Sequence, residues 1–207
     1  MPRLTDATWQ ARRQTYLEAA WRCFAREGVE RTTMATIARE AGLSAGSSYV
    51  HFRSKDELVR AAITTSMDAV EELVHASITD GSATGPVPYL KALLRSIEQF
   101  ATRMPGVDLL PLAVEGWAHA QHDPETARLV AASYTRIRGA WTDLARRWAV
   151  PGGPAAGLDP AAVAQSLGLA VLGHVAQRVL VPGTDLDAEV GGLAAWAAPH
   201  GRLTPRA

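Results

Sequence analysis

The stretch Thr32–Leu58, TTMATIAREAGLSAGSSYVHFRSKDEL, decides the fold of this 207-residue chain. Thr33 is a good N-cap for a short helix, and Gly42 supplies a residue that tolerates a positive φ before a new helix start at Ser44. The small Ala38, four residues before the glycine, lets two helices approach closely. Two short helices joined by a tight glycine-containing turn are the helix-turn-helix arrangement.

Outward from this stretch, apolar residues recur at three- and four-residue spacing, and no long alternating stretch is present, so the sequence predicts an all-α protein. Gly28 is expected to end the first helix as a C′ residue. The later helices are expected at about 33–41, 44–51, 54–79, 89–104, 107–119, 124–149, 160–181 and 184–198. Their starts are marked by Ser54 with Glu57, Asp123 with Pro124, Asp159 with Pro160, and Thr184 with Asp187.

The charge of the chain is zero on average but unevenly distributed. The sequence has 21 basic and 21 acidic residues, of which ten basic and seven acidic lie within the first 60 positions. The first 60 residues therefore carry +3 and the remainder −3, an asymmetry that suits a nucleic-acid partner for the N-terminal part. The same modest charge excludes strong non-specific affinity for nucleic acid.

Composition narrows the class of protein further. With 47% hydrophobic residues the chain can bury a core, which excludes disorder as its main state. The single cysteine, Cys23, excludes a disulfide framework and a Cys-based zinc site, and its place in an apolar helical stripe predicts burial. No apolar run approaches the length of a membrane span, and the N-terminus lacks an apolar signal core. We therefore expect a cytoplasmic protein with no membrane contact.

The N-terminal pattern resembles that of the tetracycline-repressor (TetR) family of transcriptional regulators. The matching residues are Thr33, Ile37-Ala38, Ala41-Gly42, Tyr49, His51-Phe52, Ser54-Lys55 and Glu57-Leu58. The resemblance covers about the first 60 residues strongly and the rest only by length and helical texture. It implies a three-helix DNA-binding domain with a helix-turn-helix over residues 1–55 and a helical effector-binding and dimerisation domain over residues 56–207. It also implies a ligand-responsive repressor that binds a palindromic double-stranded DNA operator as a homodimer.

The resemblance places the helix that starts at Ser44 in the major groove, where its first residues meet base edges or phosphates. Tyr49 and His51 are suited to phosphate hydrogen bonds, and Lys55 places a cation at the start of the next helix. Longer-range attraction is expected from Arg3, Arg12 and Arg13. The chain departs from the family pattern at Ser48, where a large apolar residue is expected to pack the recognition helix inward. The expected DNA-binding residues are Thr33, Ser44, Ala45, Gly46, Ser47, Tyr49, Val50, His51 and Lys55.

Effector-binding residues are expected among large, partly polar side chains of the later helices. These are Met67, Phe100, Met104, Trp117, Tyr134, Trp141, His174 and Gln177. An α-helical core uses the same residue types, so both readings stay open. Because no charge cluster stands on an inward stripe, apart from Glu115 or Arg138, the sequence predicts a small apolar or aromatic effector.

A wide face of small and apolar residues on the last two helices is the expected homodimer surface. It comprises Ala164, Leu167, Gly168, Val171, Leu172 and Val175, followed by Leu186, Val190, Leu193, Ala194 and Ala197. On the sequence alone, an intramolecular core explains this stripe equally well. Only the resemblance favours the dimer.

An enzyme is the rival class. His119 and His122 in HAQHD stand within reach of one divalent ion if a single helix carries both. Asp123-Pro124 predicts a new helix start, so we expect the helix to end between the two histidines and no metal to bind. No Gly-rich phosphate loop, Ser-His-Asp pattern or pair of carboxylates stands out, so we expect neither an enzyme nor a cofactor. A helical ligand-binding or interaction module without sequence-specific DNA binding is the remaining alternative.

Overall fold

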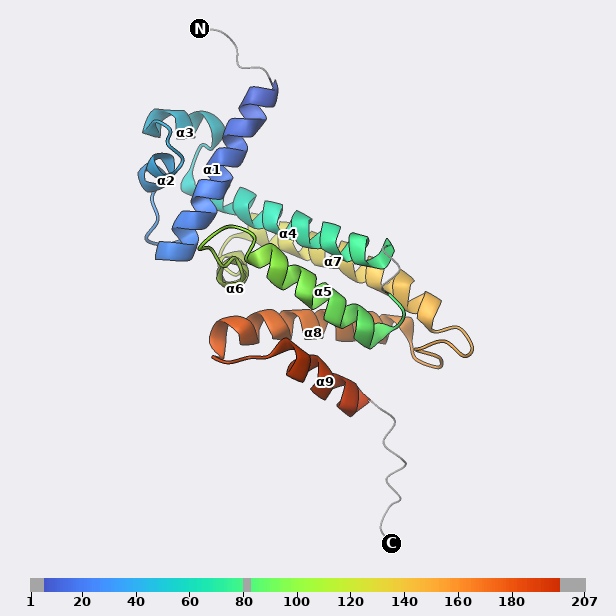
Figure 1. Ribbon diagram of the computed structural model, residues 1–207. Helices are drawn as coiled ribbons and strands as arrows, with labels where there is room; N and C mark the ends of the chain where they lie inside the picture. Colours follow the sequence, from blue (N-terminus) through green and yellow to red (C-terminus); the bar gives the residue numbers. More distant parts are fainter. Residues whose placement is uncertain (1–5, 80–82, 198–207) are drawn as a thin grey trace. The chain divides into compact units, whose positions relative to one another are not determined.

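The computed structural model describes residues 6–79 and 83–197, and within them the chain forms nine α-helices and no strand (Figure 1). The all-α prediction is therefore confirmed. The helices are α1 Asp6–Glu27, α2 Met34–Glu40, α3 Ala45–His51, α4 Lys55–Thr79, α5 Pro86–Ala101, α6 Leu110–Ala120, α7 Pro124–Trp148, α8 Pro160–Leu180 and α9 Leu186–Ala197. No helix in these two ranges is both long and apolar enough to span a membrane.

The chain divides into two compact units. Unit 1 comprises Met1–Val70 and Gln99–Tyr134, and unit 2 comprises Glu71–Glu98 and Thr135–Ala207. Helices α4 and α7 each contribute residues to both units. This grouping describes compactness and not which segment binds DNA, so a DNA-binding domain that ends at residue 55 stays a prediction.

Helices α1, α2 and α3 form the part of unit 1 that we call the head (Figure 1). Gly28 adopts φ +78° after α1, and Gly42 adopts φ +67° between α2 and α3, as the turns require. The Thr33 hydroxyl accepts a hydrogen bond from the Thr36 amide at 3.1 Å, so it caps α2 as expected. The core of the head holds Trp21, Phe24, Ile37, Ala38 and Phe52, all at most 3% exposed.

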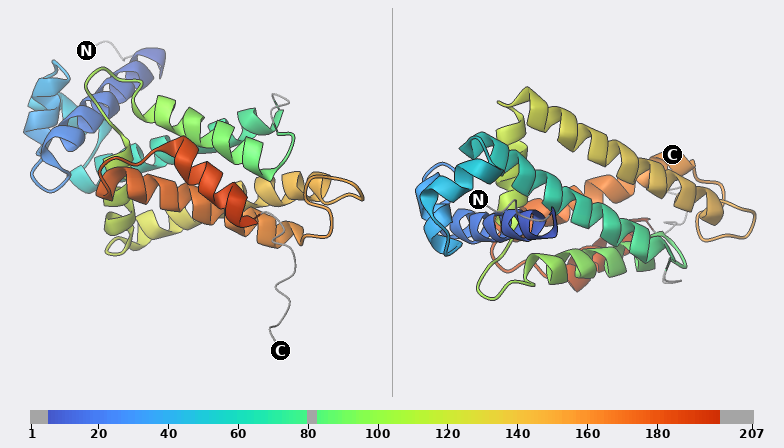
Figure 2. Two further views of the ribbon diagram at one scale, coloured as in Figure 1. Left: turned by 60° about the horizontal axis from the view of Figure 1, so that its bottom comes forward. Right: turned by 90° about the horizontal axis from the view of Figure 1, so that it is seen from above.

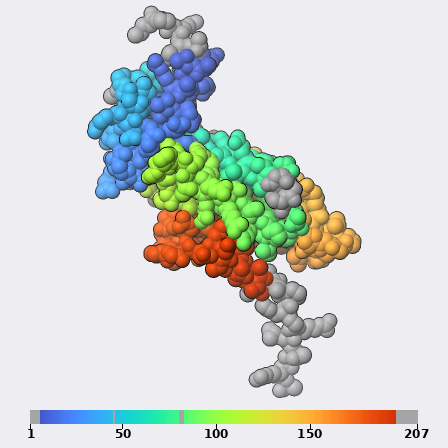
Figure 3. Space-filling model, viewed as in Figure 1, coloured from blue at the N-terminus to red at the C-terminus, as the bar shows by residue number. Residues whose placement is uncertain are grey.

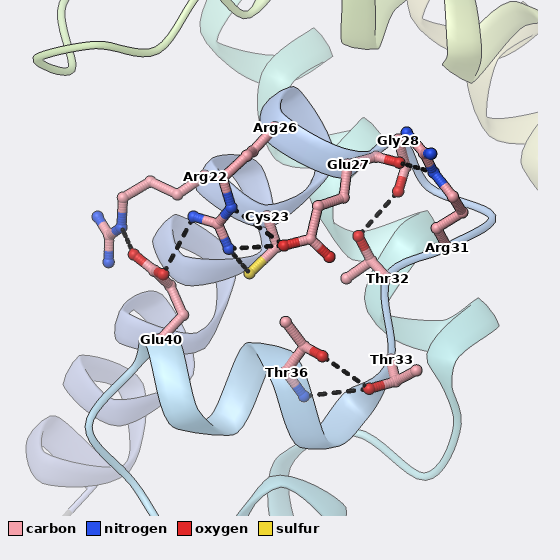
Figure 4. A network of polar contacts seen from close by, with 10 residues as sticks. All are labelled: Arg22, Cys23, Arg26, Glu27, Gly28, Arg31, Thr32, Thr33, Thr36 and Glu40. Carbon is pink, nitrogen blue, oxygen red and sulfur yellow. Dashed lines mark hydrogen bonds and ion pairs between the residues drawn. The ribbon is translucent and has the colours of Figure 1, made fainter.

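An ion-pair network joins α1 to α2 (Figure 4). Glu40 on α2 accepts hydrogen bonds from Arg22 at 2.9 Å and from Arg26 at 3.3 Å, and Arg26 also bonds Glu27. The hydrogen bond from Arg22 holds the pKa of the Glu40 carboxyl below its ordinary value. Cys23 lies beneath the network, and burial raises the pKa of its thiol, as its place in the apolar stripe predicts. Because carboxylates neutralise these two arginines, they add little to the attraction of the head for phosphate.

Unit 2 is built around α8, whose inner face is buried within the chain. Figure 2 shows α9 running beside α8, and Val190 of α9 is 4% exposed. The inner face of α8 consists of Val163, Ala164, Leu167, Val171, His174 and Val175. Five of the eleven residues predicted to face a second subunit, Ala164, Leu167, Val171, Val175 and Val190, are therefore covered by this chain itself. The prediction of a homodimer face stays open for the others. The sequence did not distinguish the two faces because α8 is apolar on nearly all sides.

Two helices differ from the predictions at their ends: α5 in its bounds and α9 in its N-cap. Helix α5 begins at Pro86 and ends at Ala101, because the chain turns after Phe100 and again at Gly106, which adopts φ +72°. Helix α9 is capped by Asp185, whose carboxylate accepts from the Ala188 amide at 2.8 Å. Thr184 was therefore wrongly predicted as the cap, because an aspartate one residue later satisfies the same amides more strongly.

Candidate nucleic-acid interface and effector site

The inner face of α3 is held by the first helix. The Tyr16 hydroxyl lies 2.7 Å from the Ser47 hydroxyl and donates to the Ser44 carbonyl at 3.3 Å. Tyr16 itself is fully buried and packs edge-on against Phe52. Ser48, the departure from the family pattern, is also fully buried. Ser47, predicted to meet base edges or phosphates, is half-buried, and its hydroxyl is engaged by Tyr16.

The outer face of α3 is exposed. Tyr49 is 58% exposed and Val50 is 68% exposed, and Ser44 and Gly46 are exposed beside them. Ala45 is the first residue of α3, but its side chain lies outside the described part of the structure. A phenol and an isopropyl group on the open side of a short helix offer one phosphate hydrogen bond and one apolar contact for a thymine methyl.

His51 is at the other end of α3, and its ring is buried. It is 5% exposed and lies against Trp9 and Tyr16, with ring centroids 5.2 and 5.7 Å away. Arg13 donates to the His51 carbonyl at 2.8 Å. Burial, with smaller contributions from Arg12 and Arg13, lowers the pKa of the imidazole from its ordinary 6.5, which favours the neutral ring. The ring thus sits inside the head, where burial disfavours the charge that a phosphate would attract.

The two remaining predicted DNA-binding residues, Thr33 and Lys55, lie at the edges of the head. Thr33 is exposed while its hydroxyl caps α2. Lys55, at the first position of α4, donates from Nζ to the Glu30 carbonyl at 2.9 Å. The lysine charge therefore lies at the α1–α2 turn, at a residue three positions before Thr33.

The sequence reasoning passed over two exposed cations, Arg39 on α2 and Arg53 between α3 and α4. Within residues 6–79 and 83–197, neither guanidinium has an ion pair or hydrogen bond, in contrast to Arg22 and Arg26. The position of Arg53, directly after the His51-Phe52 pair of the family pattern, was the signal available in the sequence. Arg3 lies outside the described residues.

Five of the eight predicted effector-binding residues lie in unit 1. Trp117 on α6 donates from Nε1 to the Tyr134 hydroxyl on α7 at 2.9 Å. Burial raises the pKa of Tyr134, and the hydrogen bond from the indole opposes that shift. Phe100 carries the Arg103 guanidinium 3.8 Å above its ring. The other two, Met67 and Met104, are half-buried.

The other three, Trp141, His174 and Gln177, lie in unit 2 and are placed differently. Trp141 is buried and donates to the Tyr89 hydroxyl at 2.8 Å, while Gln177 is exposed. His174 is 2% exposed, with Nδ1 2.7 Å from Glu189 and Nε2 3.4 Å from Glu98. The expected absence of an inward charge cluster was therefore wrong. Helix periodicity does not show it, because the two carboxylates come from α5 and α9.

The histidines of HAQHD are separated by a helix end, as predicted. Helix α6 ends at Ala120, and α7 begins at Pro124. Nε2 of His119 lies 3.9 Å from an Asp123 oxygen, and that carboxylate also bonds Arg60 and caps α7 at Thr126. In the part of the chain that the structure describes, no three metal-ligating side chains come together.

Two family models match this chain. The model described as "Bacterial regulatory proteins, tetR family" matches residues 17–62, which hold α2, α3 and the flanking parts of α1 and α4. The model described as "BetI-type transcriptional repressor, C-terminal" matches residues 92–195, half of the chain. The two models together cover α2, α3, the second half of α1 and most of the later helices.

Individual proteins agree with the family models. The chain is 36% identical over 97 residues to the HTH-type transcriptional regulator TtgR of Pseudomonas putida, a match that covers 47% of this chain and 46% of TtgR. The chain thus matches about half the length of this relative. Its fold is similar to that of a putative transcriptional regulator from Pseudomonas aeruginosa, with a TM-score of 0.72 and 27% identity over 94% of this chain and 90% of that one. A putative regulator from Saccharomonospora viridis, solved in complex with choline, has a TM-score of 0.70 at 22% identity and covers 90% and 95% of the two chains.

Proposed function

Because this chain belongs to the TetR family of bacterial transcriptional regulators, which are DNA-binding proteins and not enzymes, we propose that it represses transcription in the cytoplasm as a homodimer on a palindromic operator. A small-molecule effector changes that binding. The observation that carries this proposal is the geometry of α3. Its inner face is fixed by the buried Tyr16, and its outer face leaves Tyr49 and Val50 open.

The exposure of side chains in the head supports a smaller set of DNA contacts than the sequence predicted. Tyr49, Thr33 and Arg53 are exposed and suit phosphate contacts, while Val50 is the side chain best placed to meet a thymine methyl. His51 and Ser47 act from within the head by holding α3 in place. With this small set of contacts a single head binds weakly, and two heads on half-sites about one helical turn apart supply the affinity.

The exposed side of α8 and α9 supports the homodimer. Leu169 and Leu180 of α8 are 65% and 69% exposed, and Leu193 of α9 is 44% exposed. Figure 3 shows the segments that hold α8 and α9 in orange and red. These are large apolar side chains left open to solvent on α8 and α9, and we propose that a second copy of the chain covers them. Leu180→Glu should produce a monomer in analytical ultracentrifugation and weaken operator binding, whereas Gln165→Glu, at an exposed polar position of α8, should leave the dimer intact.

For the effector we propose a small apolar or aromatic molecule that contacts the Trp117 and Tyr134 pair. Two half-buried aromatic side chains, each with one polar atom, are what small-molecule sites use, and they also accept a quaternary ammonium group through cation–π contact. Thermal-shift titration with choline, which the Saccharomonospora relative holds, and with a set of aromatic metabolites tests this. If a compound stabilises the Trp117→Ala variant as strongly as it stabilises wild type, the proposal that the effector contacts Trp117 is contradicted.

Fluorescence-anisotropy titration with DNA flanking the protein's own gene tests the central proposal. We expect binding that prefers one palindromic sequence and weakens as salt is raised. Tyr49→Phe should reduce affinity for specific and scrambled DNA alike, and Val50→Ala should reduce only the preference for the operator. Binding of equal strength to all sequences would refute operator recognition and favour a helical module without sequence-specific DNA binding.

A further inference from the structure

Three consecutive residues of α6 contact three different elements of unit 1. Glu115 bonds the α1–α2 turn, where its Oε2 accepts from the Val29 amide at 2.9 Å. At Gly116 an added Cβ would lie 3.4 Å from the side chain of Ile63 on α4, so the two helices lie in close contact. The next residue, Trp117, donates to a hydroxyl on α7. This short segment therefore joins the aromatic pair to the head.

The bond to Val29 satisfies an amide that α1 leaves without a partner. At the end of α1, the Gly28 amide donates to the Phe24 carbonyl at 2.8 Å. This bond is the single hydrogen bond that defines the αL type of helix ending. In the alternative Schellman ending, the next amide would also donate to a helix carbonyl. Here the Val29 amide donates instead to a carboxylate from α6, and this acceptor is stronger because it is charged.

The α1–α2 turn sets the direction in which the chain enters α2. The Thr32 hydroxyl donates to the Gly28 carbonyl at 2.8 Å, and Thr33 then caps α2 (Figure 4). Lys55 donates to Glu30 in the same turn. A shift of the turn therefore moves α2, which packs against α3, and changes the orientation of the reading helix.

We propose that Glu115 is a positioning residue that transmits changes at Trp117 to the α1–α2 turn, and so to the helix-turn-helix. This inference rests on the proposed function, because it names the connection by which an effector at the Trp117 and Tyr134 pair alters DNA binding. Glu115 and Trp117 are two residues apart on the eleven-residue helix α6, so we expect a displaced indole to carry the carboxylate with it. Both ends of this segment are hydrogen bonds between named atoms, at the α1–α2 turn and at the Tyr134 hydroxyl.

A mutant cycle between Glu115 and Trp117 tests this without a known effector. Trp117→Phe removes the indole donor and leaves an apolar ring, and Glu115→Ala removes the acceptor. Amide hydrogen exchange of the peptide that contains residues 28–33 is measured in wild type, both single variants and the double variant. Glu115→Gln keeps an oxygen acceptor, and Glu72→Ala removes an exposed glutamate on α4 as the matched control.

We expect Glu115→Ala to accelerate exchange of the turn roughly tenfold, with Glu115→Gln and Glu72→Ala close to wild type. Trp117→Phe should accelerate exchange of the same turn when Glu115 is present and change it less than about twofold in the Glu115→Ala background. The operator dissociation constants of the variants should follow the same pattern, and Glu115→Ala should raise the constant about five-fold. A turn that responds to Trp117→Phe equally in both backgrounds would overturn the inference. A wild-type protein that binds no operator would overturn the proposed function instead, and the exchange cycle would still decide the role of Glu115.

Discussion

Replacing Tyr16 by phenylalanine is the most direct test of how the head holds its reading helix. Tyr16 is fully buried, with its ring 6.3 Å from Phe52 and 5.7 Å from His51. The substitution keeps the ring and removes only the hydroxyl. Two contacts to the N-terminus of α3 are lost, at 2.7 Å to Ser47 and 3.3 Å to the Ser44 carbonyl.

The magnitude follows from these two distances. A hydrogen bond of good length contributes about 1 kcal/mol to stability, and the longer bond contributes less. Ser44 is exposed and Ser47 is half-buried, so water replaces the lost partner at the first and partly at the second. We expect the free energy of unfolding to fall by about 1.5 kcal/mol. Looser anchoring of α3 should weaken operator binding by roughly three- to ten-fold.

Urea unfolding followed by tryptophan fluorescence measures this change, with all variants at one protein concentration because dimerisation adds to stability. Tyr49→Phe is the matched control, since the Tyr49 side chain is exposed, and its unfolding free energy should stay within about 0.3 kcal/mol of wild type. Combination with Ser47→Ala should be non-additive by about 1 kcal/mol. An unchanged stability of Tyr16→Phe, or an additive double variant, would refute this account of the anchor.

Three further predictions concern a cap, a titrating group and two glycines. Thr33→Ala should lower the free energy of urea unfolding by about 1 kcal/mol, because the Thr36 amide loses its cap, and an unchanged value would contradict the cap. The pKa of His51 is lowered in the folded head, so below pH 6.5 the unfolded chain binds more protons than the folded chain does. The free energy of unfolding should therefore fall as the pH drops from 6.5 towards the folded-state pKa. His51→Gln should remove this part of the pH dependence, and a variant with the same pH profile as wild type would argue against it. Gly139→Ala, with open space around the new methyl in α7, should raise the melting temperature by the equivalent of up to about 1 kcal/mol. Gly153→Ala, whose Cβ would lie 2.3 Å from the Trp148 carbonyl oxygen, should cost about 1–3 kcal/mol, and equal melting temperatures for the two variants would refute the packing argument.

The local signals in the sequence predicted the secondary structure closely. Thr33, Asp123 and Asp159 start their helices with the expected caps, and Gly28 and Gly42 adopt positive φ. These features involve residues within four positions of one another, and such interactions can be recognised in a linear chain. At the start of α9 two neighbouring residues can act as the N-cap, and Asp185 does so in place of Thr184.

The candidate site was less accessible to sequence reasoning. Helix α8 is apolar on nearly all sides, so its sequence does not show which face the rest of the chain covers. The exposed leucines can be identified only from the structure, in which the other face of α8 is buried. His51 matches the family pattern for a polar residue, yet the packing of Trp9 and Tyr16 buries it. Exposure is a property of neighbours that come from other segments, so residue type alone does not determine it.

The sequence by itself determined the helical class, the helix-turn-helix and its family, because these depend on periodicity, caps and glycine turns within short stretches of chain. The tertiary structure decided which of the predicted residues are open and which are supports. It also joined Glu115 to Val29, 86 positions apart in the chain. Contacts at such separation depend on how helices pack, and packing reflects the shape and burial of many side chains at once, which no local pattern records.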